Sequence, residues 1–252
     1  MSGHSKWSTI KHGKAVSDAR RGQLFTKLAK EIIIAARQGG GDADSNFRLR
    51  MAVQRAKDNN MPASNIQRAV NRATGDGSDK EQIVEAVYEG YGPGGTAILL
   101  ETLTDNKNRT VSEVRSTFSK AGGNMSEAGA VAWQFEQKGV VVVDPGDMDI
   151  DEITLEVIDA GADDFEGDNG EFHIYSAPEN MESIRGAMMA VGATVSSAEV
   201  SMVPTNTVSL DEKTAKSALR LLDQLEELDD VQRVYSNADF PDEVLVEYGQ
   251  ED

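Results

Sequence analysis

The chain of 252 residues contains no cysteine and only three histidines. Without thiols it cannot form disulfides, thiolate zinc sites, iron–sulfur clusters or cysteine nucleophiles. His4 and His12 could pair on a metal, but no third ligand lies near them in the sequence, so we expect neither a metal nor a cofactor. The third histidine, His173, alternates with Phe172 and Ile174 in a predicted strand, and we expect it to face solvent.

Long apolar runs are also missing, because none approaches the roughly 20 residues needed to span a bilayer. The first residues, MSGHSKWSTIKHGK, lack the apolar stretch of a secretory signal. No Gly-x-Ser-x-Gly or other nucleophile-and-base pattern occurs. We therefore expect a cytoplasmic protein that is not an enzyme, with no catalytic residues, no small-molecule substrate and no membrane partner.

The balance of charge changes along the chain. Twenty-five Lys and Arg against 43 Asp and Glu give a net charge of −18, which by itself argues against a nucleic-acid partner. Residues 1–75, however, hold 14 basic and 5 acidic side chains, a net of +9, and residues 76–252 hold 11 and 38, a net of −27. Within 139–204, 15 carboxylates stand against one cation, Arg185. This asymmetry predicts separate modules with separate partners, although an acidic surface can also be merely solvated.

Three segments near the N-terminus carry apolar residues at helical spacing. They predict helices over 17–38, 45–59 and 62–75, the last beginning at a proline, which the first helical turn favours. The second and third helices are joined by the tight turn 59–61, as in helix-turn-helix proteins. Any three-helix bundle has such a turn, so the turn alone does not indicate DNA binding.

Beyond residue 76 the sequence predicts two sheet domains. The order β-α-β-β-α-β within 139–204 is that of ferredoxin-like domains. The elements predicted around this segment are strands at 82–90, 96–104, 130–135 and 231–236, and helices at 108–121 and 211–228.

The predicted fold is therefore α+β with three domains, an N-terminal three-helix bundle and two small α/β sandwich domains, at least one of them ferredoxin-like. The basic tail and bundle occupy 1–75. A discontinuous α/β domain combines 76–138 with 205–252, and the acidic ferredoxin-like domain at 139–204 is inserted into it.

Cations of the first domain are the main candidates for a binding site. Lys and Arg side chains neutralise phosphates and release counterions, and an exposed indole such as Trp7 can stack on an unpaired base. The third helix is expected to lack an Asn- or Gln-rich face for reading DNA. An ordinary solvated helix surface is the alternative for the whole set. The candidate contacts are His4, Lys6, Trp7, Lys11, His12, Lys14, Arg20, Arg21, Lys27, Lys30, Arg48, Arg55, Arg68 and Arg72.

Several longer motifs resemble the YebC/PmpR family. The resemblance is continuous over roughly the first 140 residues, and it persists more weakly in DAGADDFE at 159–166. Its motifs are GHSKW at 3–7, DARRG at 18–22, LFTKLAKEI at 24–32, GGGD at 39–42, NMP at 60–62, YEGYGPGG at 88–95, DNKNRTVSEVR at 105–115, SKAGGN at 119–124 and AVAWQF at 130–135.

The resemblance implies a cytoplasmic, non-enzymatic, three-domain protein. Members are generally classed as probable DNA-binding transcriptional regulators. Others, including the mitochondrial translational activator of cytochrome oxidase, act in translation, and bacterial relatives have been linked to relief of ribosome stalling. Carried to this chain, the resemblance adds Ser5 to the contacts and implies that the GHSKW positions are the main ones, together with nearby Lys11, Lys14, Arg20 and Arg21. Gln23 stands where a basic residue is expected.

Three functions remain open at this stage. The first is a nucleic-acid-binding regulator of gene expression that binds DNA through the basic N-terminal domain. The second is a ribosome-associated translation factor that binds rRNA or tRNA through the same residues. The third is an interaction scaffold whose acidic domains bind a basic protein.

Overall fold

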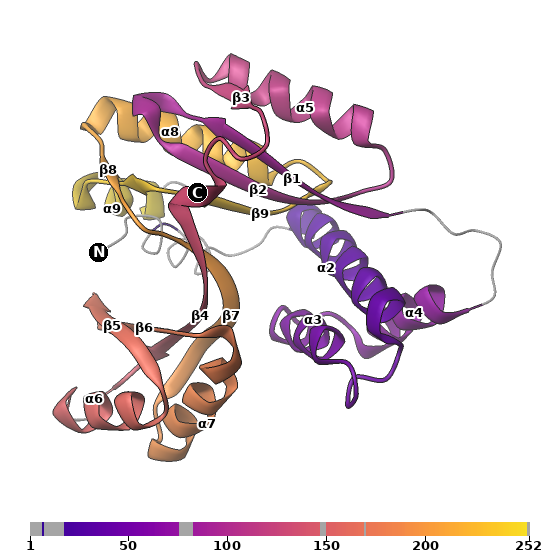
Figure 1. The fold of residues 1–252 in the computed structure, drawn as a ribbon, viewed down its shortest axis with the longest axis vertical. Coiled ribbons are helices and arrows are strands. Elements are labelled where there is room, and N and C mark those ends of the chain that lie inside the picture. The colour runs from indigo at the N-terminus through magenta and orange to yellow at the C-terminus, as the bar shows by residue number, and fades with distance from the viewer. Residues whose placement is uncertain (1–6, 8–17, 76–82, 147–149, 169, 251–252) are drawn as a thin grey trace. The chain divides into compact units, whose positions relative to one another are not determined.

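The computed structural model describes residues 7, 18–75, 83–146, 150–168 and 170–250. These residues form two compact units. One is Gln134–Thr205, here called the inserted domain, and the other, the main unit, joins the described residues on either side of it. The fold is α+β, with a helical N-terminal region and two sheet domains (Figure 1). The division of the main unit into 1–75 and a discontinuous domain, 76–138 with 205–252, stays a prediction.

The three predicted N-terminal helices are confirmed. They are α2 (Asp18–Gly39), α3 (Phe47–Asp58) and α4 (Ala63–Thr74). Asn46 begins α3, because its side-chain oxygen accepts the backbone N–H of Leu49 at 3.0 Å and its amide donates to two carbonyls at the end of α2. Asn60, at φ +58°, turns the chain between α3 and α4.

The apolar stripes of these helices meet in one core. Each helix buries residues three or four positions apart, as the sequence pattern requires. Leu103, from the sheet, and Ile83, the residue just before the first strand, are part of the same cluster, so the helices and the sheet share buried surface. The buried helical residues include Leu28, Ile32, Leu49, Ala52, Ala56, Ile66 and Ala69.

The sheet of the main unit has four antiparallel strands in the order β3-β1-β2-β9. A short helical turn, η1 (Pro93–Gly95), connects the two central strands, and Gly94 within it has φ +75°. A β-carbon at Gly94 would lie 2.5 Å from the side chain of Leu210, so only glycine fits there. The strands are β1 (Val84–Tyr91), β2 (Ala97–Thr104), β3 (Asn124–Ser126) and β9 (Val231–Ser236).

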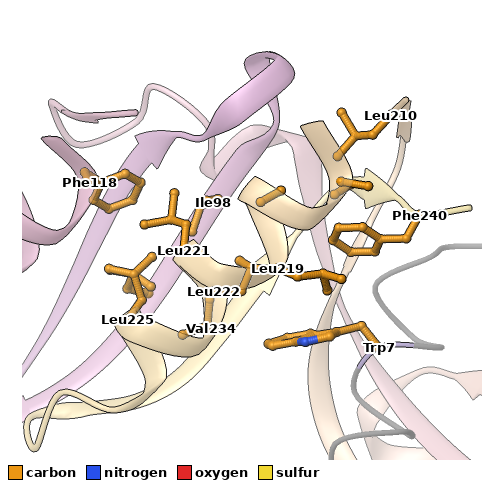
Figure 2. Packing of buried hydrophobic residues seen from close by; sticks show 14 of the residues in the cluster. Trp7, Ile98, Phe118, Leu210, Leu219, Leu221, Leu222, Leu225, Val234 and Phe240 are labelled. Carbon is orange, nitrogen blue, oxygen red and sulfur yellow. The ribbon is translucent and has the colours of Figure 1, made fainter. Parts of the chain in front are cut away.

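Two helices, α5 (Lys107–Lys120) and α8 (Glu212–Glu226), pack on one face of this sheet. Their buried side chains form one core cluster with Leu100 of β2. Ile98 of β2 and Val234 of β9 belong to the same cluster (Figure 2). Each fully buried aliphatic side chain contributes roughly 1.5–3 kcal/mol. The remaining elements are the parallel pair β8 (Val208–Ser209) and β10 (Ala238–Asp239), and the helix α9 (Asp242–Gln250).

The strand predicted at 130–135 is wrong. Ala132–Gln134 is a short 3₁₀ helix, η2, and the strand β4 begins only at Phe135. The physical reason is Glu89, whose buried carboxylate accepts the backbone N–H groups of Gly129, Val131 and Ala132 at 2.6, 2.6 and 2.8 Å. Burial raises the pKa of Glu89, but these three hydrogen bonds outweigh it and the pKa lies below its ordinary value.

The inserted domain confirms the ferredoxin-like prediction. Its sheet is antiparallel in the order β5-β6-β4-β7, and its two helices supply apolar side chains at helical spacing, such as Ile153 with Val157 and Ile184 with Met188. The expected segment 139–204 falls within this unit. Its elements are β4 (Phe135–Asp144), α6 (Ile150–Asp159), β5 (Ala162–Asp168), β6 (Glu171–Ser176), η3 (Pro178–Asn180), α7 (Met181–Val191) and β7 (Thr194–Pro204).

The expectation that His173 faces solvent is wrong. Its exposed fraction is 6%, and its neighbours Phe172 and Ile174 are buried as well. The reason is the position of β6, which lies inside the sheet between β5 and β4. In the strand register His173 is opposite Glu166 of β5 and Val142 of β4. Alternation in the sequence indicates opposite faces, but it does not show that both are covered.

Candidate nucleic-acid interface

Much of the predicted basic tail falls outside the described residues. The structure describes the backbone of Arg20 but not its side chain. The candidate contacts that lie outside the described residues are His4, Ser5, Lys6, Lys11, His12 and Lys14.

The expected exposed indole of Trp7 is wrong. Its exposed fraction is 1%, and it belongs to the core cluster that contains Leu219 and Phe240 (Figure 2). Burying an indole removes one of the largest apolar side chains from water, which favours this position over an exposed one. In this structure the indole of Trp7 is therefore part of the core and is not available to stack on a base.

Two candidate arginines of α3 lie in ion pairs with distant residues. Arg48 holds Glu85 of β1 through two parallel bonds, each 2.9 Å from nitrogen to oxygen. Arg55 lies 3.2 Å from Glu31 of α2, and Glu31 is also 3.0 Å from Arg233 of β9. The structure brings Arg48 and Arg55 to the junction between bundle and sheet, where their guanidinium groups form ion pairs with Glu85 and Glu31.

Glu31 is the central carboxylate of this junction. Burial by itself raises the pKa of Glu31, but the positive charges of Arg55, Arg233 and Arg48 outweigh burial. The pKa therefore lies below its ordinary value and Glu31 is ionised at neutral pH. A buried carboxylate of this kind is stable only with its cationic partners in place.

Cations of α2 also reach the sheet domain. Lys27 donates to the backbone carbonyl of Glu226, at the end of α8. Gln23, where the resemblance leads one to expect a cation, donates to the Asp229 carboxylate at 2.8 Å. Arg21 is exposed at the start of the same helix. Of these candidates, the structure leaves Arg21 on the surface and places Lys27 in an interdomain contact.

Asp230 collects a second set of contacts at the same junction. Its carboxylate is 2.8 Å from Lys30, a candidate contact on α2, and 2.6 Å from Arg109 of α5. The hydroxyls of Thr104 and Thr110 donate to it at 3.1 and 2.9 Å. Burial raises the pKa of Asp230, but the hydrogen bonds from Lys30, Arg109 and Thr110 lower it to about 2.

The outer face of α4 is the surface that best fits the predicted interface. Arg68 and Arg72 are exposed there, one turn apart, on the side away from Ile66. Gln67 and Asn71 lie beside them, also exposed, with the Gln67 amide donating to the Asn71 carbonyl oxygen at 2.9 Å. Helix α4 contains no acidic residue, so nothing within it neutralises this face.

Gln67 and Asn71 correct the prediction that this helix lacks an amide face. The signal was present in the sequence, because both amides occur at the same i, i+4 spacing as the two arginines. Together the four side chains offer donors and acceptors of the kind that contact base edges in a DNA groove. The turn from α3 into α4 gives the helix pair the local connectivity of a helix-turn-helix.

Among the described residues, no three His, Asp or Glu side chains lie close enough to hold a metal ion. No described helix has the length and apolar character to cross a membrane.

The fold and the α4 face define a three-domain α+β protein with a cationic helical domain. The sequence model of the TACO1/YebC N-terminal domain matches residues 5–76, and that of the TACO1/YebC second and third domain matches residues 83–238. The chain belongs to the TACO1/YebC family.

Relatives of high identity cover the whole chain. A probable transcriptional regulatory protein of Dehalococcoides mccartyi strain CBDB1 is 55% identical over 98% of both chains. Another, from Chloroflexus aurantiacus, is 53% identical over 98% of this chain and 99% of its own. The crystal structure of the conserved hypothetical protein Aq1575 from Aquifex aeolicus superimposes with a TM-score of 0.82 at 42% identity, covering 92% of this chain and 96% of that one.

Proposed function

We propose that this protein regulates gene expression by binding duplex DNA through its N-terminal region, with α4 as the helix that reads the bases. The observation that carries the proposal is the outer face of α4, where Gln67, Arg68, Asn71 and Arg72 are exposed together without an acidic neighbour on the helix. The names of the relatives, probable transcriptional regulatory proteins, support the same function.

The α4 face suits base reading by its chemistry. Arginine pairs with the edge of guanine, and Asn or Gln pairs with the edge of adenine, each through two hydrogen bonds. An α-helix with its side chains is about 10–12 Å across, which fits the width of the major groove, and the 12 residues of α4 give it a length of about 18 Å. Arg68 and Arg72 would then discriminate guanine, and Gln67 and Asn71 adenine.

The N-terminal charge supplies the affinity that base reading alone lacks. Residues 1–75 carry a net charge of +9, and each phosphate contact made by a cation releases counterions. In this proposal the tail cations, such as Lys6, Lys11 and Lys14, hold the phosphates. The remaining chain, at −27, repels DNA, so the protein binds with its helical region turned to the duplex.

Binding to ribosomal RNA has lost one of its supports. The argument for RNA combined an irregular basic tail with an exposed Trp7 that could stack on unpaired bases, and the indole is buried in the sheet domain. No feature of the described residues favours RNA over DNA in its place. We therefore treat RNA as an outcome of the test.

Crosslinking in cells, followed by sequencing of attached DNA and RNA, tests the proposal. The wild type should recover a set of DNA sites, and Arg68→Ala with Arg72→Ala should lose them. Arg50→Ala is the control, because Arg50 is an exposed arginine of a different helix, α3, where it stacks over Phe47, 5.4 Å from its ring centre. Recovery of ribosomal RNA without DNA, unaffected by the α4 changes, would overturn the proposal.

A further inference from the structure

Helix α5 has one face on the sheet and one in solvent. Thr110, Val114 and Phe118, four residues apart, are buried against the strands. The outward side carries cations and small polar groups. The one carboxylate of the helix, Glu113, is half-buried, and none of the exposed residues is acidic. The exposed residues are Lys107, Asn108, Arg109, Ser112, Arg115, Ser116, Ser119 and Lys120.

The cations of this face are unusual for their surroundings. They are all four of the basic residues between 83 and 133, in a body whose charge is otherwise strongly negative. Arg109 contacts Asp105 and Asp230. Lys107, Arg115 and Lys120 form no ion pair with any residue that the structure describes. Three exposed cations are thus available to an external anion.

The neighbouring helix α8 provides a comparison within the same layer. It also exposes two cations without partners among the described residues, Lys213 and Arg220. Its exposed residues, however, include the acidic Glu212, and Asp223 and Glu226 on the same helix are half-buried. The exposed charges on α8 are therefore mixed, as on an ordinary solvated helix, whereas the exposed charges of α5 are all positive.

We propose that the outward face of α5 is a second nucleic-acid contact, which binds the phosphate backbone of the polymer held by the N-terminal region. This inference rests on the proposed function in one respect, that the N-terminal region binds a nucleic acid. It does not depend on α4 reading the base sequence. Phosphate oxygens accept hydrogen bonds from arginine, lysine, serine and asparagine side chains, which are the groups that α5 exposes. An α5 of 14 residues, about 21 Å long, can follow several successive phosphates.

The α5 contact orients the protein on the polymer. Phosphate contacts fix register and direction but carry no sequence information. The protein then has one cationic surface on α4 and another on α5. The nucleic acid would touch the sheet domain only at α5, where that domain is positive. This explains how a body of high negative charge can lie beside a polyanion.

Binding of a duplex of random sequence, measured at several salt concentrations, tests the α5 contact apart from base reading. Arg115→Glu with Lys120→Glu should weaken binding at least tenfold and reduce the slope of log K against log salt by about 2, because two phosphate contacts are lost. Lys213→Glu with Arg220→Glu reverses the same number of charges on α8 and should change the affinity less than threefold.

Equal effects of the two double variants, or no effect of the α5 pair, would overturn the inference. If the Glu pair disturbs folding, as judged by circular dichroism, Arg115→Gln with Lys120→Gln replaces it and should still reduce the slope. If the wild type binds a random duplex with the same affinity as every chosen sequence, base reading by α4 is contradicted. The inference about α5 would not be affected by that result. A wild type that binds no duplex at all would overturn both.

Discussion

Glu31 of α2 and Arg233 of β9 are 202 positions apart in the chain, and their side chains form an ion pair of 3.0 Å. Arg233 also reaches Glu101 of β2 at 3.3 Å, and Arg55 of α3 reaches Glu31 from the other side. Arg55, Glu31, Arg233 and Glu101 thus form a chain of ion pairs that links the bundle to the sheet. This junction sets the position of the cationic helices on the body of the main unit.

Replacing Glu31 by Gln should destabilise the protein by about 1–3 kcal/mol, because the partly buried guanidinium groups of Arg55 and Arg233 lose their charged acceptor. Urea unfolding measures the change. Glu212→Gln is the matched control, since Glu212 pairs with Lys216 on an exposed surface at 2.9 Å and such pairs contribute about 0.3–0.5 kcal/mol. Equal losses for the two variants would contradict the role of the junction.

The stability of the protein should fall in acid partly through Asp230. Its pKa is lowered from the ordinary 3.8 to about 2, so its contribution is complete above pH 3.8 and is lost as the pH falls toward 2. A shift of this size corresponds to about 2 kcal/mol. Asp230→Asn should be less stable than the wild type at pH 6, and the difference should shrink between pH 4 and pH 2 in unfolding experiments. A difference that stays constant over that range would contradict the assignment.

The two tryptophans should behave in opposite ways. Trp7→Ala removes a fully buried indole and should lower the free energy of unfolding by about 3–5 kcal/mol. The side chain of Trp133 has an exposed fraction of 70%, so Trp133→Ala should lower it by less than about 0.5 kcal/mol. Thermal unfolding measures both. In addition, the fluorescence of the Trp133→Phe variant, which reports Trp7 alone, should resist quenching by acrylamide. Strong quenching would show that Trp7 lies in solvent.

Glu89 should control the loop that precedes the inserted domain. Glu89→Gln replaces a carboxylate that accepts three backbone N–H groups by an amide with one acceptor oxygen. The amides of Gly129, Val131 and Ala132 should then exchange with solvent about tenfold faster or more, as hydrogen-exchange NMR can measure. Glu127→Gln, an exposed change in the same loop, should leave these rates unaltered. Equal exchange in wild type and Glu89→Gln would contradict the role of Glu89.

Local pattern predicted most of the fold, because helices and strands are set by nearby residues. Leu49, Ala52 and Ala56 recur at helical spacing, and the structure buries all three. The strand expected at 130–135 failed because its backbone is held by Glu89, some 40 positions earlier in the chain. A side chain that organises a distant loop leaves no periodic signal in that loop.

Prediction of the site was limited by the same difficulty. Arg48 and Arg55 look like surface cations on a helix, and only the folded chain brings Glu85 and Glu31 to them. Trp7 has no apolar neighbours in a repeating pattern, so its burial depends on partners more than 200 positions away. Gln67 and Asn71, by contrast, could have been found, because their spacing with the arginines of α4 is local.

Selection of duplexes from a randomised pool tests the central claim, that α4 reads DNA, most directly. The wild type should enrich a defined sequence, and Gln67→Ala with Asn71→Ala should lose the preference for adenine at particular positions while its affinity for random duplex stays within about threefold. Gln54→Ala, which removes an amide of α3 that contacts Asp58 at 2.7 Å, should select the same sequence as the wild type. Failure of the wild type to enrich any sequence, or identical selection by the wild type and the α4 double variant, would contradict the claim.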